Sequence, residues 1–195
     1  YGKEGFKRLI SRCSLRRIHI KWFLASAFIM ILISLLTVLL HGIVFGNPGN
    51  ANQWYSFIDF FSILPIMIFF SLLEEVGWRG FALPELRKRF NPFSSALILG
   101  FIWGIWHLPK LISEGMDNVG SFIAFIVFVL LISILISWIY ENTGGNILLS
   151  ILTHASVNAA IYGINSDILP NVSYNSGTVV LDIVLMLFII IILIV

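Results

Sequence analysis

The chain has 195 residues, of which 58% are hydrophobic and only 11% are charged, and its formal net charge is +2. A soluble domain carries about 25% charged residues, so this composition excludes a globule that covers its surface with polar groups. It indicates a protein whose solvent is the lipid bilayer. The apolar runs are long and continuous, which excludes a membrane barrel built from strands of about ten alternating residues.

The segment before the first apolar run is strongly basic. It holds seven of the twelve basic residues, namely Lys3, Lys7, Arg8, Arg12, Arg16, Arg17 and Lys21. Because Lys and Arg concentrate on the cytoplasmic side of membranes, we expect the N-terminus to be cytoplasmic. A nucleic-acid-binding arm is the alternative interpretation, but it fits poorly directly beside a membrane span, and we predict no nucleic-acid partner.

Six apolar segments follow one another, at about residues 22–45, 54–79, 93–111, 122–140, 146–161 and 179–195. Between the second and third, Pro84 bends or restarts the chain as a short basic stretch near residues 80–90. We therefore predict an all-α fold, a polytopic bundle of about six transmembrane helices plus a short basic amphipathic helix. It forms a single integral membrane domain over residues 1–195, which we expect to be a fragment because the chain ends within an apolar run.

Rare polar side chains interrupt these apolar segments. They are Glu74, Glu75 and Arg79 in the second segment, His107 in the third, and His154 and Asn158 in the fifth. A charged side chain at the centre of a membrane helix costs about 2.5–3.5 kcal/mol on insertion scales, so such residues are retained for function. We predict that these six residues form the functional site.

The sequence places these groups at similar depths. If the turn between the second and third segments is centred near residues 90–91, Glu75 lies fifteen to sixteen residues before it and His107 sixteen to seventeen after it. Both then lie at most ~25 Å from the turn, and His154 lies about 12 Å beyond Asn146. We expect one polar layer in the cytoplasmic half of the membrane, in a cavity that opens to the cytoplasm.

Helical spacing predicts which side chains share a face. Glu75 and Arg79 are four residues apart, as are His154 and Asn158, so each pair lies on one side of its helix. Arg79 would neutralise one glutamate and fix its rotamer, or the pair could serve only as an ion pair that locks two helices together.

Two glycines precede the third-segment histidine. Gly100 and Gly104 form a small-xxx-small pair just before His107. Such pairs let membrane helices approach closely, which short polar side chains need in order to meet.

A cluster of this kind supports activation of water. A desolvated carboxylate beside a histidine takes a proton from water as general base, and a second histidine with an asparagine can donate to an oxyanion. Glu75, His107 and His154 also match a zinc site with an open fourth position, so Zn²⁺ is a possible cofactor. The sequence leaves open which of these holds the water, and which glutamate acts as the base.

Three motifs in this order resemble those of the CAAX protease and bacteriocin-processing family, also called the CPBP or ABI family. Residues 74–79, EEVGWR, match its EExxxR motif; residues 106–109, WHLP, look like its second motif; and residues 154–158, HASVN, match HxxxN. The resemblance covers residues 64–163, about half the chain. One position departs from the family pattern FxxxH, because Trp103 stands where the phenylalanine is expected. We predict that Trp103 serves in packing, as do Trp78 and Trp106.

The resemblance implies an intramembrane endopeptidase that cuts a membrane-embedded peptide or a lipidated protein. It implies that a glutamate of the first motif and His107 activate water, while His154 and Asn158 stabilise the oxyanion. Both a metal-dependent and a metal-free glutamate mechanism are argued for the family. Some members cut prenylated CAAX tails and others are linked to bacteriocin immunity and peptide processing, so the substrate stays open.

Two other functions fit the same polar cluster, a small transporter and a non-catalytic membrane immunity or scaffold protein. Transporters usually show paired broken helices in two related halves, and this sequence has no such internal symmetry. Intact motifs argue against the scaffold. The oligomeric state is not predicted.

Overall fold

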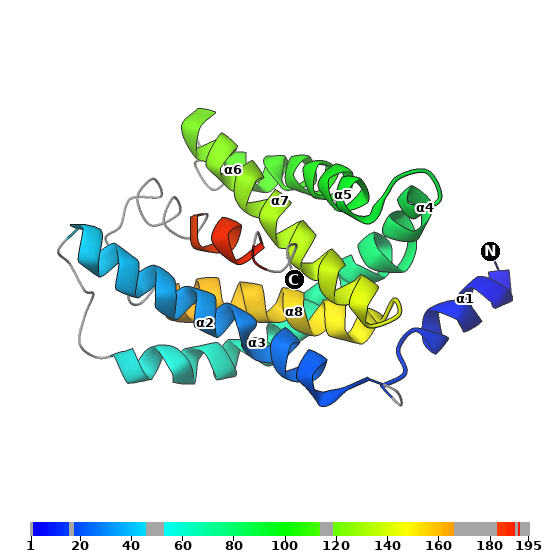
Figure 1. Ribbon diagram of the computed structural model, residues 1–195, viewed down its shortest axis with the longest axis horizontal. Coiled ribbons are helices and arrows are strands. Elements are labelled where there is room, and N and C mark those ends of the chain that lie inside the picture. The colour runs from blue at the N-terminus through cyan, green and yellow to red at the C-terminus, as the bar shows by residue number, and fades with distance from the viewer. Residues whose placement is uncertain are drawn as a thin grey trace.

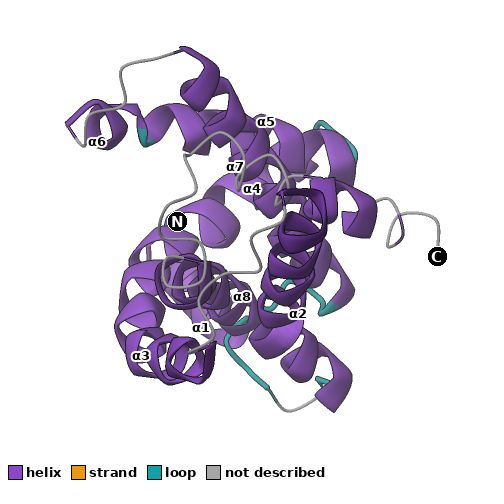
Figure 2. Ribbon diagram, turned by 90° about the vertical axis from the view of Figure 1, so that its left-hand side faces the viewer, coloured by secondary structure: helices purple, strands orange, loops and turns teal. Residues whose placement is uncertain are grey.

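The computed structural model describes residues 2–15, 18–45, 53–113, 119–165, 183–189 and 191. Every regular element in these ranges is helical, which confirms the predicted all-α fold (Figure 2). In chain order the elements are α1 (Gly2–Ser11), α2 (Ile20–Phe45), α3 (Gln53–Gly77), η1 (Trp78–Ala82), α4 (Leu83–Arg87), α5 (Pro92–Trp106), α6 (Leu108–Ser113), α7 (Val119–Asn142), α8 (Ile147–Ala159) and η2 (Ala160–Asn165).

Four helical stretches within the described ranges are long and apolar enough to cross a bilayer, namely Ile20–Val44, Ile58–Arg87, Pro92–Ser113 and Val119–Asn142. They correspond to the first four predicted segments and confirm a multi-pass membrane protein. The fifth, Ile147–Tyr162, is a shorter apolar helix. Of the sixth segment, residues 183–189 and 191 are helical, and the rest of residues 179–195 lies outside the described residues.

Helix α8 forms the centre of the bundle and packs against α2, α3 and α7, while α5 packs against α7 (Figure 1). Almost every residue of α8 is buried, including both its apolar and its small polar side chains. A helix that is enclosed on all sides by protein need not match the thickness of the lipid. This explains why a segment predicted as a membrane span is shorter than the other four.

Helix α3 changes its winding directly after the two glutamates. Residues Trp78–Ala82 form a π-helical turn, in which the amide of Leu83 donates to the carbonyl of Trp78, and α4 then begins with Pro84 in its first turn. In a continuous α-helix the Pro84 ring would clash with the carbonyl four residues earlier, and the wider turn avoids this. The bend therefore begins before Pro84, and α4 is the short basic helix that was predicted.

The third segment is divided into two helices at its histidine. Helix α5 ends at Trp106, His107 is its C-cap, and α6 begins at Leu108. Pro109 explains the break, because it has no amide hydrogen to donate to the carbonyl of Ile105. The side chain of His107 is thus presented at a helix end rather than in the middle of a continuous span.

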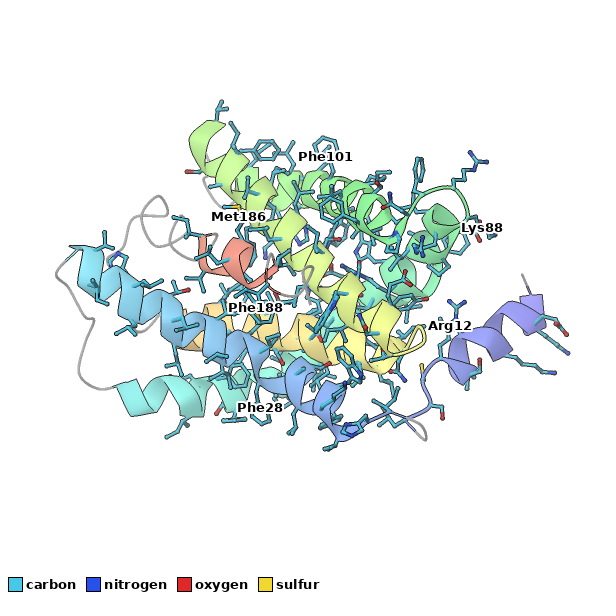
Figure 3. All side chains as sticks on the ribbon, in the orientation of Figure 1. Arg12, Phe28, Lys88, Phe101, Met186 and Phe188 are labelled. Atoms are coloured by element: carbon cyan, nitrogen blue, oxygen red, sulfur yellow. The ribbon has the colours of Figure 1, made fainter. Side chains whose placement is uncertain are left out.

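Two basic residues from distant parts of the chain, Arg12 and Lys88, lie at the same end of the molecule (Figure 3). Figure 3 shows Arg12 and Lys88 at the end where the α4–α5 and α7–α8 turns lie, and Figure 1 shows α1 beyond the same end. Phe28 and Phe101 lie on the flanks and are largely exposed, as lipid-facing side chains should be. Arg12 of the N-terminal segment and Lys88 of the α4–α5 turn are therefore brought to the same end of the bundle (Figure 3).

Candidate active site

The most buried part of the site joins the first and third motifs. Oε1 of Glu75 accepts a hydrogen bond from Nη1 of Arg79 at 2.9 Å, and Nδ1 of His154 lies 2.9 Å from the same oxygen. The side chains of Glu75 and Arg79 are both 0% exposed and that of His154 is 3% exposed. The predicted meeting of Glu75 with His154 is thus present, across the interface of α3 and α8.

Arg79 extends this cluster to a third helix. Its Nη2 donates to the carbonyl oxygen of Ser133 at 3.4 Å and to the Ser133 hydroxyl at 3.3 Å. The Ser133 hydroxyl in turn donates to the carbonyl of Ala96 on α5 at 2.8 Å. Through Arg79, at the start of η1, this cluster is connected to α7 and, through Ser133, to α5.

Glu74 lies in a different environment from its neighbour. Its Oε2 accepts a hydrogen bond from the indole Nε1 of Trp103 at 2.8 Å, and its side chain is half-buried. No hydrogen bond to Oε1 occurs within the described ranges. Successive residues of a helix point about 100° apart, which is why Glu74 faces α5 while Glu75 faces α8.

His107 is held in a defined tautomer by the backbone. Its Nδ1 lies 3.0 Å from the carbonyl oxygen of Trp103, and a carbonyl can only accept, so Nδ1 carries the hydrogen. In neutral imidazole the other nitrogen, Nε2, then has a free lone pair. Three aromatic rings surround the imidazole, with centroid distances of 5.8 Å to Trp103, 5.0 Å to Trp106 and 5.6 Å to Phe125.

The third motif presents a histidine and an asparagine on successive turns of α8. His154 directs Nδ1 to the Glu75 carboxylate, so its Nε2 is the nitrogen left for a ligand. Asn158 lies one turn further along the helix and is half-buried. Its amide makes no hydrogen bond in the part of the chain that the structure describes.

The donor set for zinc is not assembled in this arrangement. Among the described residues, no group of three or more His, Cys, Asp or Glu side chains is placed to hold a metal ion. Glu75 binds Arg79 and His154, whereas His107 is fixed to the carbonyl of Trp103. The three side chains considered as zinc ligands therefore do not fit the metal in this arrangement, and no step of the mechanism below uses it.

The structure gives Trp103 contacts that the sequence did not predict. Trp103 is 4% exposed and contacts both glutamate-bearing and histidine-bearing elements of the site. We predicted only a packing role for it. The signal was present in the sequence, as the single departure from the FxxxH pattern, but composition and spacing give no reason to expect an indole N–H directed at Glu74.

The fold and the cluster together define a class, the multi-pass integral membrane proteins in which glutamate and histidine side chains meet inside a helical bundle. The family described as type II CAAX prenyl endopeptidase, Rce1-like, matches residues 54–160, a range that contains all three motifs. The chain belongs to this family. This confirms the resemblance that the motifs indicated.

A curated relative is similar over much of the chain. The protein named CAAX prenyl protease 2 from Methanococcus maripaludis is 28% identical over an alignment of 167 residues, and the match covers 80% of this chain and 60% of that protein. The chain thus spans about 60% of the length of the curated relative it matches.

Proposed function

We propose that this protein is an intramembrane endopeptidase that cuts a peptide bond in a membrane-associated, prenylated protein. The observation that carries the proposal is the pair of neighbouring carboxylates in unequal environments. Each carboxylate leaves one oxygen without a hydrogen bond, but Oε2 of Glu75 is fully buried beside a cation, whereas Oε1 of Glu74 belongs to a half-buried side chain. A water-activating base needs a reachable lone pair, and the open carboxylate offers one.

Glu74 is the general base in this proposal, and Glu75 is a positioning residue. Glu75 already accepts from Arg79 and His154 through a single oxygen and has no solvent exposure. A carboxylate held in a buried ion pair is poorly suited to gain and release a proton during each turnover. Its function is to hold Arg79 and to orient the His154 ring.

His107 assists Glu74 in holding the water. Its Nδ1 donates to the Trp103 carbonyl, which leaves Nε2 to accept one water hydrogen while Oε1 of Glu74 accepts the other. The surrounding rings limit the access of bulk solvent to the imidazole. Both groups depend on Trp103 for their orientation.

His154 and Asn158 form the oxyanion site. Because Nδ1 of His154 donates to Glu75, donation from Nε2 as well requires the imidazolium form, whose charge suits a developing oxyanion. The amide of Asn158, one turn further along α8, supplies a second donor. Two donors placed before the reaction stabilise charge that appears only in the transition state.

The reaction then balances as a hydrolysis. The water oxygen forms a bond to the carbonyl carbon of the substrate, and the water proton passes to Glu74. The carbonyl oxygen becomes the oxyanion that His154 and Asn158 hold. When the intermediate collapses, the carbon–nitrogen bond breaks, Glu74 returns the proton to the leaving nitrogen, and the products are a carboxylic acid and an amine.

The proposal of a prenylated substrate rests on the description of the family and on the name of the relative, both of which specify a prenyl protease or endopeptidase. A lipid anchor would hold the substrate at the membrane surface and deliver its peptide to the bundle. The basic surface formed around Arg12 and Lys88 fits a cytoplasmic face. We therefore propose that the N-terminus and the opening of the site are cytoplasmic.

The proposal is tested with the full chain reconstituted in liposomes. The substrate is a farnesylated peptide ending in a CAAX sequence, and release of its last three residues is followed by mass spectrometry. We expect cleavage by the wild-type protein and none by Glu74→Gln with its folding retained. Since the zinc ligands do not assemble, we expect cleavage to persist after exhaustive zinc chelation.

Other results would favour the alternatives. Flux of a trapped solute that depends on the same residues, without peptide cleavage, would support a transporter. Equal cleavage by wild type and Glu74→Gln would assign the base to another group. A farnesylated peptide left intact, while an unlipidated membrane peptide is cut, would retain the protease and replace the substrate class.

A further inference from the structure

Trp103 contacts every charged or titratable part of the site except Glu75. Its indole N–H donates to Glu74 at 2.8 Å, and its ring centroid lies 4.9 Å from that of His154 and 5.8 Å from that of His107. The guanidinium carbon of Arg79 lies 5.1 Å from the centroid of the same ring. The indole is therefore the surface on which the two halves of the site meet.

The hydrogen bond to Glu74 has only one possible direction. An indole nitrogen can only donate, and an ionised carboxylate can only accept, so no tautomer or amide orientation has to be assumed. The contact is short and the donor is 4% exposed, so water does not compete effectively for it. It fixes Oε2 of Glu74 and thereby determines where Oε1 points.

The backbone of the same residue holds the partner of Glu74. The carbonyl oxygen of Trp103 accepts from Nδ1 of His107, one turn later on the same helix. The two groups proposed to hold the water are thus both hydrogen-bonded to Trp103. Glu74 binds its side chain, and His107 binds its main-chain carbonyl. A displacement of the indole moves Glu74 and leaves the His107 bond in place.

We propose that Trp103 is a positioning residue that aligns the Glu74 carboxylate with His107 through its indole N–H. A phenylalanine, which the family pattern places here, packs similarly but has no donor. The inference rests on the proposed function for its effect on turnover, and the hydrogen bond itself is testable without any turnover.

The test compares three changes in the full chain. Trp103→Phe removes the donor and trims the ring. Replacement of Trp103 by benzothienylalanine puts sulfur in place of the N–H and keeps the shape of the ring. Trp138→Phe is the matched control, because Trp138 packs edge-on against Trp22 at 5.0 Å, on α7 and outside the site.

A hydrogen bond to a charged group contributes enough that its loss corresponds to roughly a 10- to 100-fold change. We therefore expect kcat for the farnesylated peptide to fall by roughly that factor in both Trp103 variants, with KM nearly unchanged, and no fall in Trp138→Phe. Full activity in the benzothienylalanine protein, with loss only in Trp103→Phe, would overturn the proposal in favour of packing. A rise in KM alone would overturn it in favour of substrate binding.

An ultraviolet resonance Raman measurement separates this inference from the proposed function. The difference spectrum between wild type and Trp103→Phe isolates the Trp103 indole, whose N–H band reports hydrogen bonding. We expect a bonded indole in the wild type and an unbonded one in Glu74→Ala. An indole that is insensitive to Glu74 would overturn the positioning role even if the protease is active. A sensitive indole in a protein without peptidase activity would retain the bond and remove the proposed function.

Discussion

The two sides of Trp103 differ in how deeply their charges are buried and in whether those charges form an ion pair, although Oε2 of Glu75 and Nε of Arg79 make no hydrogen bond. On one side Glu75, Arg79, His154 and Ser133 form what we call the paired cluster, in which the glutamate and the arginine are 0% exposed. On the other side Glu74 and His107 form the open pair, which is half-buried and attached to Trp103. Under the proposed function, one carboxylate of the motif would serve structure and its neighbour would serve chemistry.

Two physical effects explain this difference between the two glutamates, namely the rotation between successive helix residues and the cost of burying a charge. A residue step of about 100° turns the two carboxylates toward different helices. The carboxylate that faces the centre of the bundle must be paired, because an uncompensated buried charge is costly. Both carboxylates leave one oxygen without a hydrogen bond, but that of Glu74 lies in the less enclosed region, where a ligand can reach it.

The largest expected effect is on activity and comes from the open pair. Glu74→Gln keeps the shape of the side chain and its acceptor for the Trp103 indole but removes the base, so we expect kcat to fall on the order of 10³-fold. The apparent melting temperature in detergent should change little. Peptide cleavage and thermal unfolding, measured on the same preparation, check both expectations.

Glu75→Gln is the matched contrast, since it makes the same chemical change one residue away. It leaves the buried Arg79 without its ion-pair partner, and we expect a clear fall in melting temperature together with lost activity. If instead Glu75→Gln were inactive and stable while Glu74→Gln unfolded, the roles of the two carboxylates would be exchanged.

The next effect is on stability and comes from the paired cluster. Removing one member of a buried ion pair costs about 3–5 kcal/mol, so Arg79→Met should be strongly destabilised. Changing both partners, in Glu75→Leu with Arg79→Met, removes the unpaired charge and should recover part of that loss. Activity should stay low in the double variant, because His154 has lost the acceptor that orients it.

Unfolding of the two variants in detergent, followed by circular dichroism, provides the measurement. A double variant no more stable than Arg79→Met would show that Arg79 acts mainly through Ser133 and the Trp103 ring. The principal partner of Arg79 in the paired cluster would then be α7 rather than Glu75.

Much of this arrangement could be predicted from the sequence, and the reason is periodicity. The four-residue spacings that placed Glu75 with Arg79, and the depth estimate that placed His154 beside Glu75, depend only on helical rise and turn. Single-domain organisation over residues 1–195 and the catalytic roles stay predictions. The partner of Glu74 could not be predicted, because it depends on how far α5 rotates against α3, which spacing along one helix does not determine.

Helix breaks were predicted only approximately, for a related reason. Pro84 and Pro109 indicate that an α-helix cannot continue unchanged. The position of each break depends on where the backbone carbonyls can still find hydrogen-bond donors. The π-helical turn begins at Trp78, six residues before Pro84, and the break in the third segment falls on His107 itself. The π-helical turn contains Arg79, and the break in the third segment places His107, a proposed catalytic residue, at a helix end.

A smaller effect distinguishes two glycines that bring α5 against α7. A Cβ on Gly100 would lie 2.8 Å from Cβ of Ser133 and 3.2 Å from the backbone of Leu130, whereas one on Gly104 would meet mainly Cδ1 of Ile126, at 2.6 Å. Backbone and Cβ atoms cannot move aside as the end of an isoleucine can. We expect Gly100→Ala to cost about 1–3 kcal/mol and Gly104→Ala to be nearly neutral.

This pair sharpens the comparison because Ser133 belongs to the paired cluster. Gly100→Ala should displace the Ser133 hydroxyl from Arg79 and lower the unfolding temperature, while Gly104→Ala serves as the control of identical chemistry on the same helix. Equal stability of the two variants would mean that α5 and α7 shift apart without disturbing the paired cluster.

The smallest effect concerns the end of α8, the helix that supplies His154 to the paired cluster. Asn146 is its N-cap, and Oδ1 accepts from the amide of Leu149 at 3.1 Å while Nδ2 donates to the carbonyl of Ser14 at 2.8 Å. Loss of an N-cap typically costs about 1 kcal/mol, so Asn146→Ala should lower stability by about that amount. The open pair lies on other helices. We therefore expect kcat of Asn146→Ala to match that of the wild type at temperatures where the variant is folded.

Asn146→Asp separates the two contacts, since aspartate caps a helix as well as asparagine but cannot donate to Ser14. The amide of Ile147 also donates to the carbonyl of Arg12 at 3.0 Å, so the segment after α1 is tied to α8 through the backbone as well. We expect the aspartate variant to unfold nearer to wild type than the alanine variant does. If both variants unfold alike, the tie to Ser14 rather than the cap secures this end of α8, and the N-terminal segment becomes part of what keeps the paired cluster in place.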